Sequence, residues 1–190
     1  GNAPSGNPPT MPGQDAADST TTDDTTDKQP VLLITGGKIT VNADGDGLDS
    51  NGDLRVEGGD ITINGPSNGG NGALDIGTEN GGAGVIAGGT LIALGTSSMA
   101  ENFGSTSTQC AFLVTMNSFG AGETITITDS QGNVLYTGLT VKSANSVVFS
   151  SADLVVGETY TVTIGSISAT VTQSSTVVGN SNGFGGFGRH

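Results

Sequence analysis

The chain has 190 residues and a formal net charge of −13, from five Lys and Arg residues against 18 Asp and Glu residues. This balance argues against nucleic acid and anionic membranes as partners, because both need a basic surface. No apolar run approaches the roughly 20 residues that span a bilayer, so no membrane insertion is expected.

The chain begins with a low-complexity segment, residues 1–30. It holds five of the six prolines and the run Thr20-Thr-Thr-Asp-Asp-Thr-Thr-Asp27, and it has no apolar periodicity. These features are typical of a linker or tail.

Residues 31–105 carry a repeat whose copies are marked by Gly-Gly pairs. The pairs start at positions 36, 58 and 88, so the spacings are 22 and 30 residues. A repeat of this length, with β-type alternation around each pair, predicts an all-β solenoid of about three stacked coils. The glycines are expected at the corners between short strands.

Alignment on the Gly-Gly pairs places apolar residues in three columns. These are Ile34, Val56 and Ile86; Ile39, Ile61 and Leu91; and Val41, Ile63 and Ala93. Alternate residues of a strand face the same side, so the columns are expected to stack inward. The residues between them, Thr40, Thr62 and Ile92, are expected to face outward.

A further column runs through the loops. It aligns Leu48, Leu74 and Met99, which are expected to stack inside the coils. Asp49 and Asp75 would then lie one above the other on adjacent coils, about 4.8 Å apart by strand spacing.

Residues 106–175 show a different pattern, typical of antiparallel strands. The β-rich runs are 111–116, 124–128, 134–136, 146–149, 159–164 and 166–171. Hairpin turns are expected at 129–133 and 165–166. This segment is predicted to form a β-rich cap or small sandwich, followed by a Gly-rich tail, residues 176–190.

Acidic residues crowd into the first loop of the repeat. The candidate metal ligands there are Asp44, Asp46, Asp49, Asn51 and Asp53, joined by Asp75 from the next coil. Stacked carboxylates repel one another, and a hard cation with oxygen ligands such as Ca²⁺ relieves the repulsion. The alternative is an ordinary Asn/Asp/Gly turn on a solvated corner.

Catalysis is not expected. A pectate-lyase-like reaction needs calcium and a strong base, and Arg55 is the sensible candidate base. Because Arg55 lies between two inward residues, it should face outward beside Asp53 as a solvated ion pair. The single histidine, His190, ends the Gly-rich tail, so a His-based triad is excluded.

Several strings of the chain resemble one family. They include Ile34-Thr-Gly-Gly-Lys-Ile-Thr-Val-Asn-Ala-Asp-Gly-Asp-Gly-Leu-Asp-Ser-Asn-Gly52, Asn71-Gly-Ala-Leu-Asp75 and Gly88-Gly-Thr-Leu-Ile-Ala-Leu-Gly-Thr-Ser-Ser-Met-Ala100. Over about residues 31–165 the chain is similar to secreted bacterial carbohydrate-binding domains with a calcium-binding, pectate-lyase-like right-handed parallel β-helix.

The resemblance implies calcium on the acidic turns, with Asp46, Asp49, Asn51, Asp75 and Asn71 as the positions that match. It implies binding of cellulose or polygalacturonate without established catalysis. Family members carry further β-helix coils before this region. Those N-terminal coils, or identical subunits, are therefore expected to cover the open end of the helix.

The predicted function is an extracellular or cell-surface, calcium-stabilised module that binds acidic or plant cell-wall polysaccharides. The alternative is a structural subunit: a calcium-stabilised surface filament or adhesin in which homo-oligomers form by β-helix stacking and tail exchange.

Overall fold

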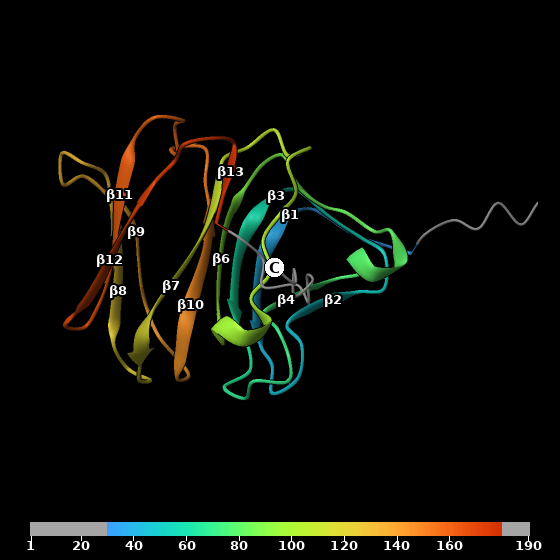
Figure 1. Ribbon diagram of the computed structural model, residues 1–190, viewed down its shortest axis with the longest axis horizontal. Helices are drawn as coiled ribbons and strands as arrows, with labels where there is room; N and C mark the ends of the chain where they lie inside the picture. Colours follow the sequence, from blue (N-terminus) through green and yellow to red (C-terminus); the bar gives the residue numbers. More distant parts are fainter. Residues whose placement is uncertain (1–29, 180–190) are drawn as a thin grey trace, which may run out of the picture.

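The computed structural model describes residues 30–179, and almost all of its regular structure is β (Figure 1). The strands are β1 (Val31–Asn42), β2 (Leu48–Ser50), β3 (Asp53–Asn64), β4 (Leu74–Ile76), β5 (Gly84–Ile86), β6 (Thr90–Gly95), β7 (Ala111–Phe119), β8 (Thr124–Thr128), β9 (Val134–Leu139), β10 (Ala144–Ser150), β11 (Thr159–Ile164), β12 (Ile167–Thr172) and β13 (Val177–Val178). Two short 3₁₀ helices, η1 (Thr78–Asn80) and η2 (Ser97–Met99), complete the list. The all-β prediction is confirmed. Within residues 30–179, neither helix is long and apolar enough to cross a membrane.

The repeat copies pair as parallel strands. β1 pairs with β3, β3 pairs with β5 and β6, and β2 pairs with β4. The register matches all three predicted columns, which join Ile34 to Val56 and Ile86, Ile39 to Ile61 and Leu91, and Val41 to Ile63 and Ala93. We call this set of strands, β1 to β6 with their loops, the parallel stack. Its inward apolar side chains form one core cluster.

The Gly-Gly pairs were expected at corners between short strands, but only the third pair separates two strands, since β1 and β3 each run unbroken through theirs. The second glycine of each pair has a positive φ, +91° at Gly37, +110° at Gly59 and +85° at Gly89. The pairing of β1 with β3 shifts register at the same place, between Ile34 and Lys38. Only glycine adopts this backbone conformation without strain, so the repeated glycines allow the irregularity at these positions.

The second half of the chain extends the first sheet and adds another. β10 pairs antiparallel with β6 and with β7, so one sheet runs in the order β1-β3-β6-β10-β7-β13. A separate four-stranded antiparallel sheet, β12-β11-β8-β9, packs against it on the left of Figure 1. Aromatic and branched side chains from both sheets, including Phe112, Phe149 and Tyr160, form a second core cluster.

Both predicted hairpins are present. Asp129 and Asn133 close the β8–β9 turn through a backbone hydrogen bond of 3.0 Å, and Gly165 with φ +55° turns β11 into β12. The boundary expected at residue 105 stays a prediction, since the first sheet continues across it from β6 to β10. Of the two predicted tails, residues 1–29 and 180–190 lie outside the described residues, and residues 177–178 form β13.

One expectation about a single side chain was right and another was wrong. Ile92 faces outward from the stack as expected, and it is only 1% exposed because the four-stranded sheet covers that face. Met99 is 37% exposed on η2, whereas the next residue, Ala100, is buried in the core of the stack. The predicted alignment of the third loop was therefore shifted by one residue.

Candidate metal centre

The parallel pairing of β2 with β4 brings two predicted ligands together. Leu48 pairs with Leu74 and Asp49 with Asp75, in the predicted register. Neighbouring strands lie about 4.8 Å apart, so the two carboxylates project side by side from the same corner of the stack. Asp49 is exposed and Asp75 is half-buried.

Asp46 joins this corner through the loop that precedes β4. Its Oδ1 accepts a hydrogen bond of 2.7 Å from the backbone N–H of Gly72. Gly47 lies so close to the backbone of Ala73 that a Cβ there would overlap its carbonyl oxygen. Glycine at this position therefore lets the two loops pack tightly and holds Asp46 against residues 70–72.

Asn71 lies beside Asp46. Its amide satisfies both neighbours when the nitrogen donates to the carbonyl oxygen of Gly70 at 3.1 Å and to Oδ2 of Asp46 at 3.2 Å. Together with the bond from Gly72 to Oδ1, these contacts tie Asp46 to the loop that precedes β4.

Glu101 is a member of the site that the sequence interpretation missed. Its Oε2 accepts a hydrogen bond of 2.8 Å from the backbone N–H of Ile76, directly after Asp75. Leu48 and Leu74 are 26 residues apart (74 − 48), and so are Leu74 and Ala100 (100 − 74). This constant spacing is the signal that makes Ala100 the third inward residue and Glu101 the third carboxylate.

The carboxylates of this corner repel one another. Burial raises the pKa of Asp75, and the neighbouring charges of Asp46, Asp49 and Glu79 raise it further. Burial also raises the pKa of Glu101, against the lowering effect of the Ile76 hydrogen bond, and the charge of Asp75 adds to the rise. We call Asp46, Asp49, Asp75 and Glu101 the carboxylate stack.

Two of the predicted ligands are engaged elsewhere. Asp44 forms an ion pair with Lys142 at 2.7 Å, and this hydrogen bond lowers its pKa. Asp53 forms one with Arg55 at 2.7 Å and accepts a hydrogen bond of 3.0 Å from Ala83, and both contacts lower its pKa.

Asn51 and Arg55 also lie apart from the carboxylate stack. Asn51 is exposed, and its contact with the next coil is a hydrogen bond of 3.5 Å from the Asn80 side chain to its backbone carbonyl. Arg55 is exposed beside Asp53, as the sequence predicted.

No basic side chain balances the carboxylate stack in the described part of the chain. Its three Lys and Arg residues, Lys38, Arg55 and Lys142, pair with Asp60, Asp53 and Asp44. Within residues 30–179, no group of three His, Cys, Asp or Glu side chains converges closely enough to hold a metal by itself. An ion here would therefore also need carbonyl or water oxygens.

Comparison of the chain with protein-family models, with curated proteins and with solved structures gives no match.

Proposed function

We propose that the chain is an extracellular, calcium-stabilised module that binds acidic polysaccharides and has no catalytic role. The observation that carries the proposal is the carboxylate stack, in which Asp49 and Asp75 lie on paired strands and no basic side chain of residues 30–179 balances them. The resemblance to calcium-binding carbohydrate-binding domains supports the same function. We also propose that the parallel stack is a right-handed parallel β-helix of about three coils, on the basis of the β1-β3-β6 and β2–β4 pairings.

The donor set fits Ca²⁺. This ion accepts six to eight oxygen ligands from carboxylates, amides, carbonyls and water in irregular geometry. Asp46, Asp49 and Asp75 would hold it, and Glu101 lies directly beside Asp75 through its bond to Ile76. The bound ion would neutralise the repulsion that raises the pKa of Asp75. Asp49 is exposed, so an ion at this corner would remain open to a uronate carboxylate from a glycan.

A polar hollow adjoins this corner. It has a volume of about 320 Å³ and is lined mainly by hydroxyl and amide groups, among them Ser67, Thr96, Ser98 and Asn145. The Thr96 hydroxyl donates to the carbonyl of Asn71 at 3.4 Å, so the hollow and the loop of Asn71 are directly joined. Hydroxyl and amide groups are the partners that sugar hydroxyls use in binding sites.

Calcium titration followed by thermal unfolding tests the metal. We expect the wild-type Tm to rise with calcium and to fall back with a chelator, because a ligand that binds only the native state stabilises it, by about 2.7 kcal/mol at 100 times Kd. Asp46→Asn and Asp75→Asn should lose most of this rise. Asp60→Asn, a carboxylate paired with Lys38 away from the corner, is the matched control. Equal shifts in all four proteins, or none, would contradict the proposal.

Retention on immobilised polygalacturonate tests the ligand. The wild-type protein and Asp60→Asn should be retained in calcium and released by chelator, whereas Asp49→Asn should bind weakly in both conditions. Release of unsaturated uronate, measured by its near-ultraviolet absorbance, would instead indicate a lyase.

A second candidate function, the structural subunit, is favoured by the exposed end of the stack. Within residues 30–179 no strand pairs with the outer edge of β1. Ile39 and Val41 are only partly buried, although Ile61 and Ile63, one coil further on, are 1% and 0% exposed. Val31 and Leu33 are about half exposed on the same strand. An uncovered strand edge with an apolar end face invites another polypeptide to stack there.

Light scattering distinguishes the two candidates. A filament subunit should form calcium-dependent polymers without glycan, and Val41→Lys should abolish them. Thr40→Lys adds the same charge to the opposite face of β1 and should leave them intact. A monomer in calcium would leave only the binding module.

A further inference from the structure

The outer face of the four-stranded sheet carries a regular array of hydroxyl groups. Residues that alternate along these strands, such as Ile125, Ile127, Val162 and Ile164, are buried in the second core cluster. Their neighbours therefore point away from the core. These outward residues are Ser168, Thr170 and Thr172 on β12; Thr159, Thr161 and Thr163 on β11; Thr124, Thr126 and Thr128 on β8; and Val134, Thr137 and Leu139 on β9. We call this set the hydroxyl face.

The hydroxyls form rows across the strands. One row joins Thr170, Thr161 and Thr128, and the next joins Ser168, Thr163, Thr126 and Thr137. Strand geometry spaces neighbours in a row by about 4.8 Å and successive rows by about 6.7 Å. The Thr159 and Thr172 hydroxyls bond each other at 2.9 Å, and in the described part of the chain the other eight have no protein partner. Most of the array is free to bond a ligand.

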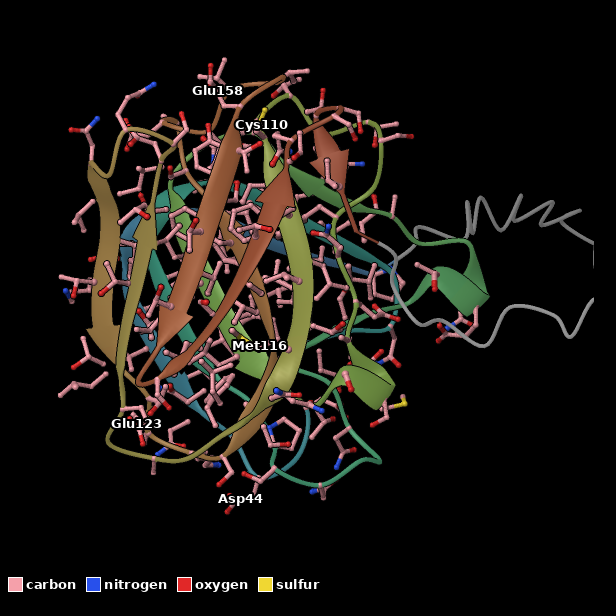
Figure 2. All side chains as sticks on the ribbon, turned by 60° about the vertical axis from the view of Figure 1, so that its left-hand side comes forward. Asp44, Cys110, Met116, Glu123 and Glu158 are labelled. Atoms are coloured by element: carbon pink, nitrogen blue, oxygen red, sulfur yellow. The ribbon has the colours of Figure 1, made fainter. Side chains whose placement is uncertain are left out.

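The hydroxyl face carries no charge although the chain as a whole is strongly acidic. None of its twelve side chains is ionisable. In Figure 2, which looks toward the four-stranded sheet, Glu158 and Glu123 lie beyond opposite ends of the strands. At the β9 edge, Val134 and Leu139 are 60% and 65% exposed. The high β propensity of threonine explains its frequency on these strands. It does not explain the edge strand β9, because exposed edges are commonly protected by charged residues and β9 has none.

We propose that the hydroxyl face binds an uncharged, flexible glycan chain. Sugar hydroxyls match the free threonine hydroxyls as donors and acceptors, while the threonine methyls, Val134 and Leu139 offer apolar contact to the C–H faces of the sugars. Adjacent strands twist by about 20–25°, so a rigid planar lattice fits only part of the face, whereas a flexible chain follows it. Anionic polymers meet no cation on the face. This proposal extends the polysaccharide-binding function to a second, calcium-independent site.

Binding of soluble hydroxyethylcellulose to the full chain tests the proposal by affinity gel electrophoresis in calcium and in chelator. The wild-type protein should be retarded equally in both. Thr137→Glu with Thr170→Glu, two exposed positions on different strands, should weaken retardation at least tenfold, and Thr106→Glu in an exposed loop should not. Thr161→Val keeps the shape but removes a hydroxyl, and it should weaken binding by a smaller factor while unfolding at the wild-type temperature.

Four outcomes would overturn the proposal. They are no retardation of the wild type, retardation that the face variants leave unchanged, retardation that chelator removes, and loss of a dimer rather than of glycan binding in the face variants. The calcium proposal fails separately, through the melting experiment and polygalacturonate retention. A protein that binds hydroxyethylcellulose but gains no stability from calcium would therefore support the hydroxyl face alone.

Discussion

The parallel stack and the four-stranded sheet place polar groups in opposite ways. The stack collects carboxylates at one corner, where Asp49 and Asp75 lie side by side and no basic residue of the described chain balances them. The four-stranded sheet exposes ten hydroxyls and no charge on its outer face. The difference follows from local structure: the acidic residues occupy Gly-rich turns that repeat from coil to coil, whereas the threonines alternate with buried residues along strands.

One strand of the stack nevertheless contributes to the cores of both regions. β6 directs Leu91 into the core of the stack and the next residue, Ile92, into the second core, and Ile92 pairs with Phe149 of β10. A strand that lines both cores should couple their stabilities, which gives the first and largest prediction.

Phe149→Ala should destabilise the protein by about 3–5 kcal/mol, since this side chain is 0% exposed and packs against Phe112 and Tyr136. Leu91→Ala should cost about 2–5 kcal/mol from the other core. Urea unfolding should show one transition in both variants. The chain has no Trp and two Tyr residues, so its fluorescence comes mainly from Tyr136 and Tyr160. Both lie in the second core. Tyrosine fluorescence that changes at a different urea concentration from circular dichroism would show that the regions unfold separately.

Gly59→Ala should cost about 1–3 kcal/mol through strain that arises in the stack. Its φ is +110°, and a Cβ there would lie 3.0 Å from the carbonyl oxygen of Gly37 on the preceding coil. Gly36→Ala is the matched control, because a Cβ at Gly36 meets no atom within 4 Å. Equal melting temperatures for the two variants would show that the corner tolerates a side chain.

The parallel register could be predicted from the sequence because each copy repeats both its glycines and its alternation. Two independent signals then fix the same alignment, as the pairing of Ile39 with Ile61 and Leu91 shows. The third loop lacks these signals. The predicted alignment therefore placed Met99 instead of Ala100 in the column of Leu48 and Leu74, and Glu101 was not recognised as the equivalent of Asp49 and Asp75. The burial of Ile92 could not be predicted from its own repeat, since the sheet that covers it comes from residues 124–172.

The candidate metal site was predictable only in part. Asp49 and Asp75 follow from the repeat, but Asp44 and Asp53 look equivalent to them in a list of acidic residues. The ion pairs of Asp44 and Asp53 distinguish these two residues from Asp49 and Asp75. One of the pairs depends on Lys142, 98 residues away from Asp44. The position of such a distant cation is decided by the packing of the β9–β10 loop, which no local pattern encodes.

Lys142→Met should cost about 1–2 kcal/mol because it removes a contact between the two regions. The Lys142 ammonium donates to the carbonyl of Ala43 at 2.5 Å and to Asp44 at 2.7 Å, and its side chain is 19% exposed. Most of the loss should come from the Ala43 hydrogen bond, since Asp44 is fully exposed. Lys38→Met, which breaks an exposed pair with Asp60 within the stack, should cost no more than about 0.5 kcal/mol. Chemical denaturation of both variants measures the difference.

The smallest expected effect, below about 1 kcal/mol, comes from Glu101→Gln in chelator. Because the folded protein raises the pKa of Glu101, the native state holds this proton more tightly than the unfolded state does. Stability should therefore fall as pH rises from the unfolded pKa through the folded pKa, and the penalty is complete above that range. Glutamine keeps an oxygen for the Ile76 N–H but cannot ionise. The variant should match the wild type at acid pH and exceed it at neutral pH.

Thermal unfolding of the wild type and Glu101→Gln across pH measures this difference in stability. Glu123→Gln, from the four-stranded sheet's side of the molecule, is the control. Glu123 is exposed beside the turn before β8 and is not among the charges that act on Glu101, so its variant should keep the wild-type response of Glu101 to pH. In saturating calcium the order should reverse, since an ion held at the stack favours the ionised carboxylates and Glu101→Gln removes one of them. A variant that stays more stable than the wild type in calcium would show that Glu101 contributes repulsion without helping to hold the ion.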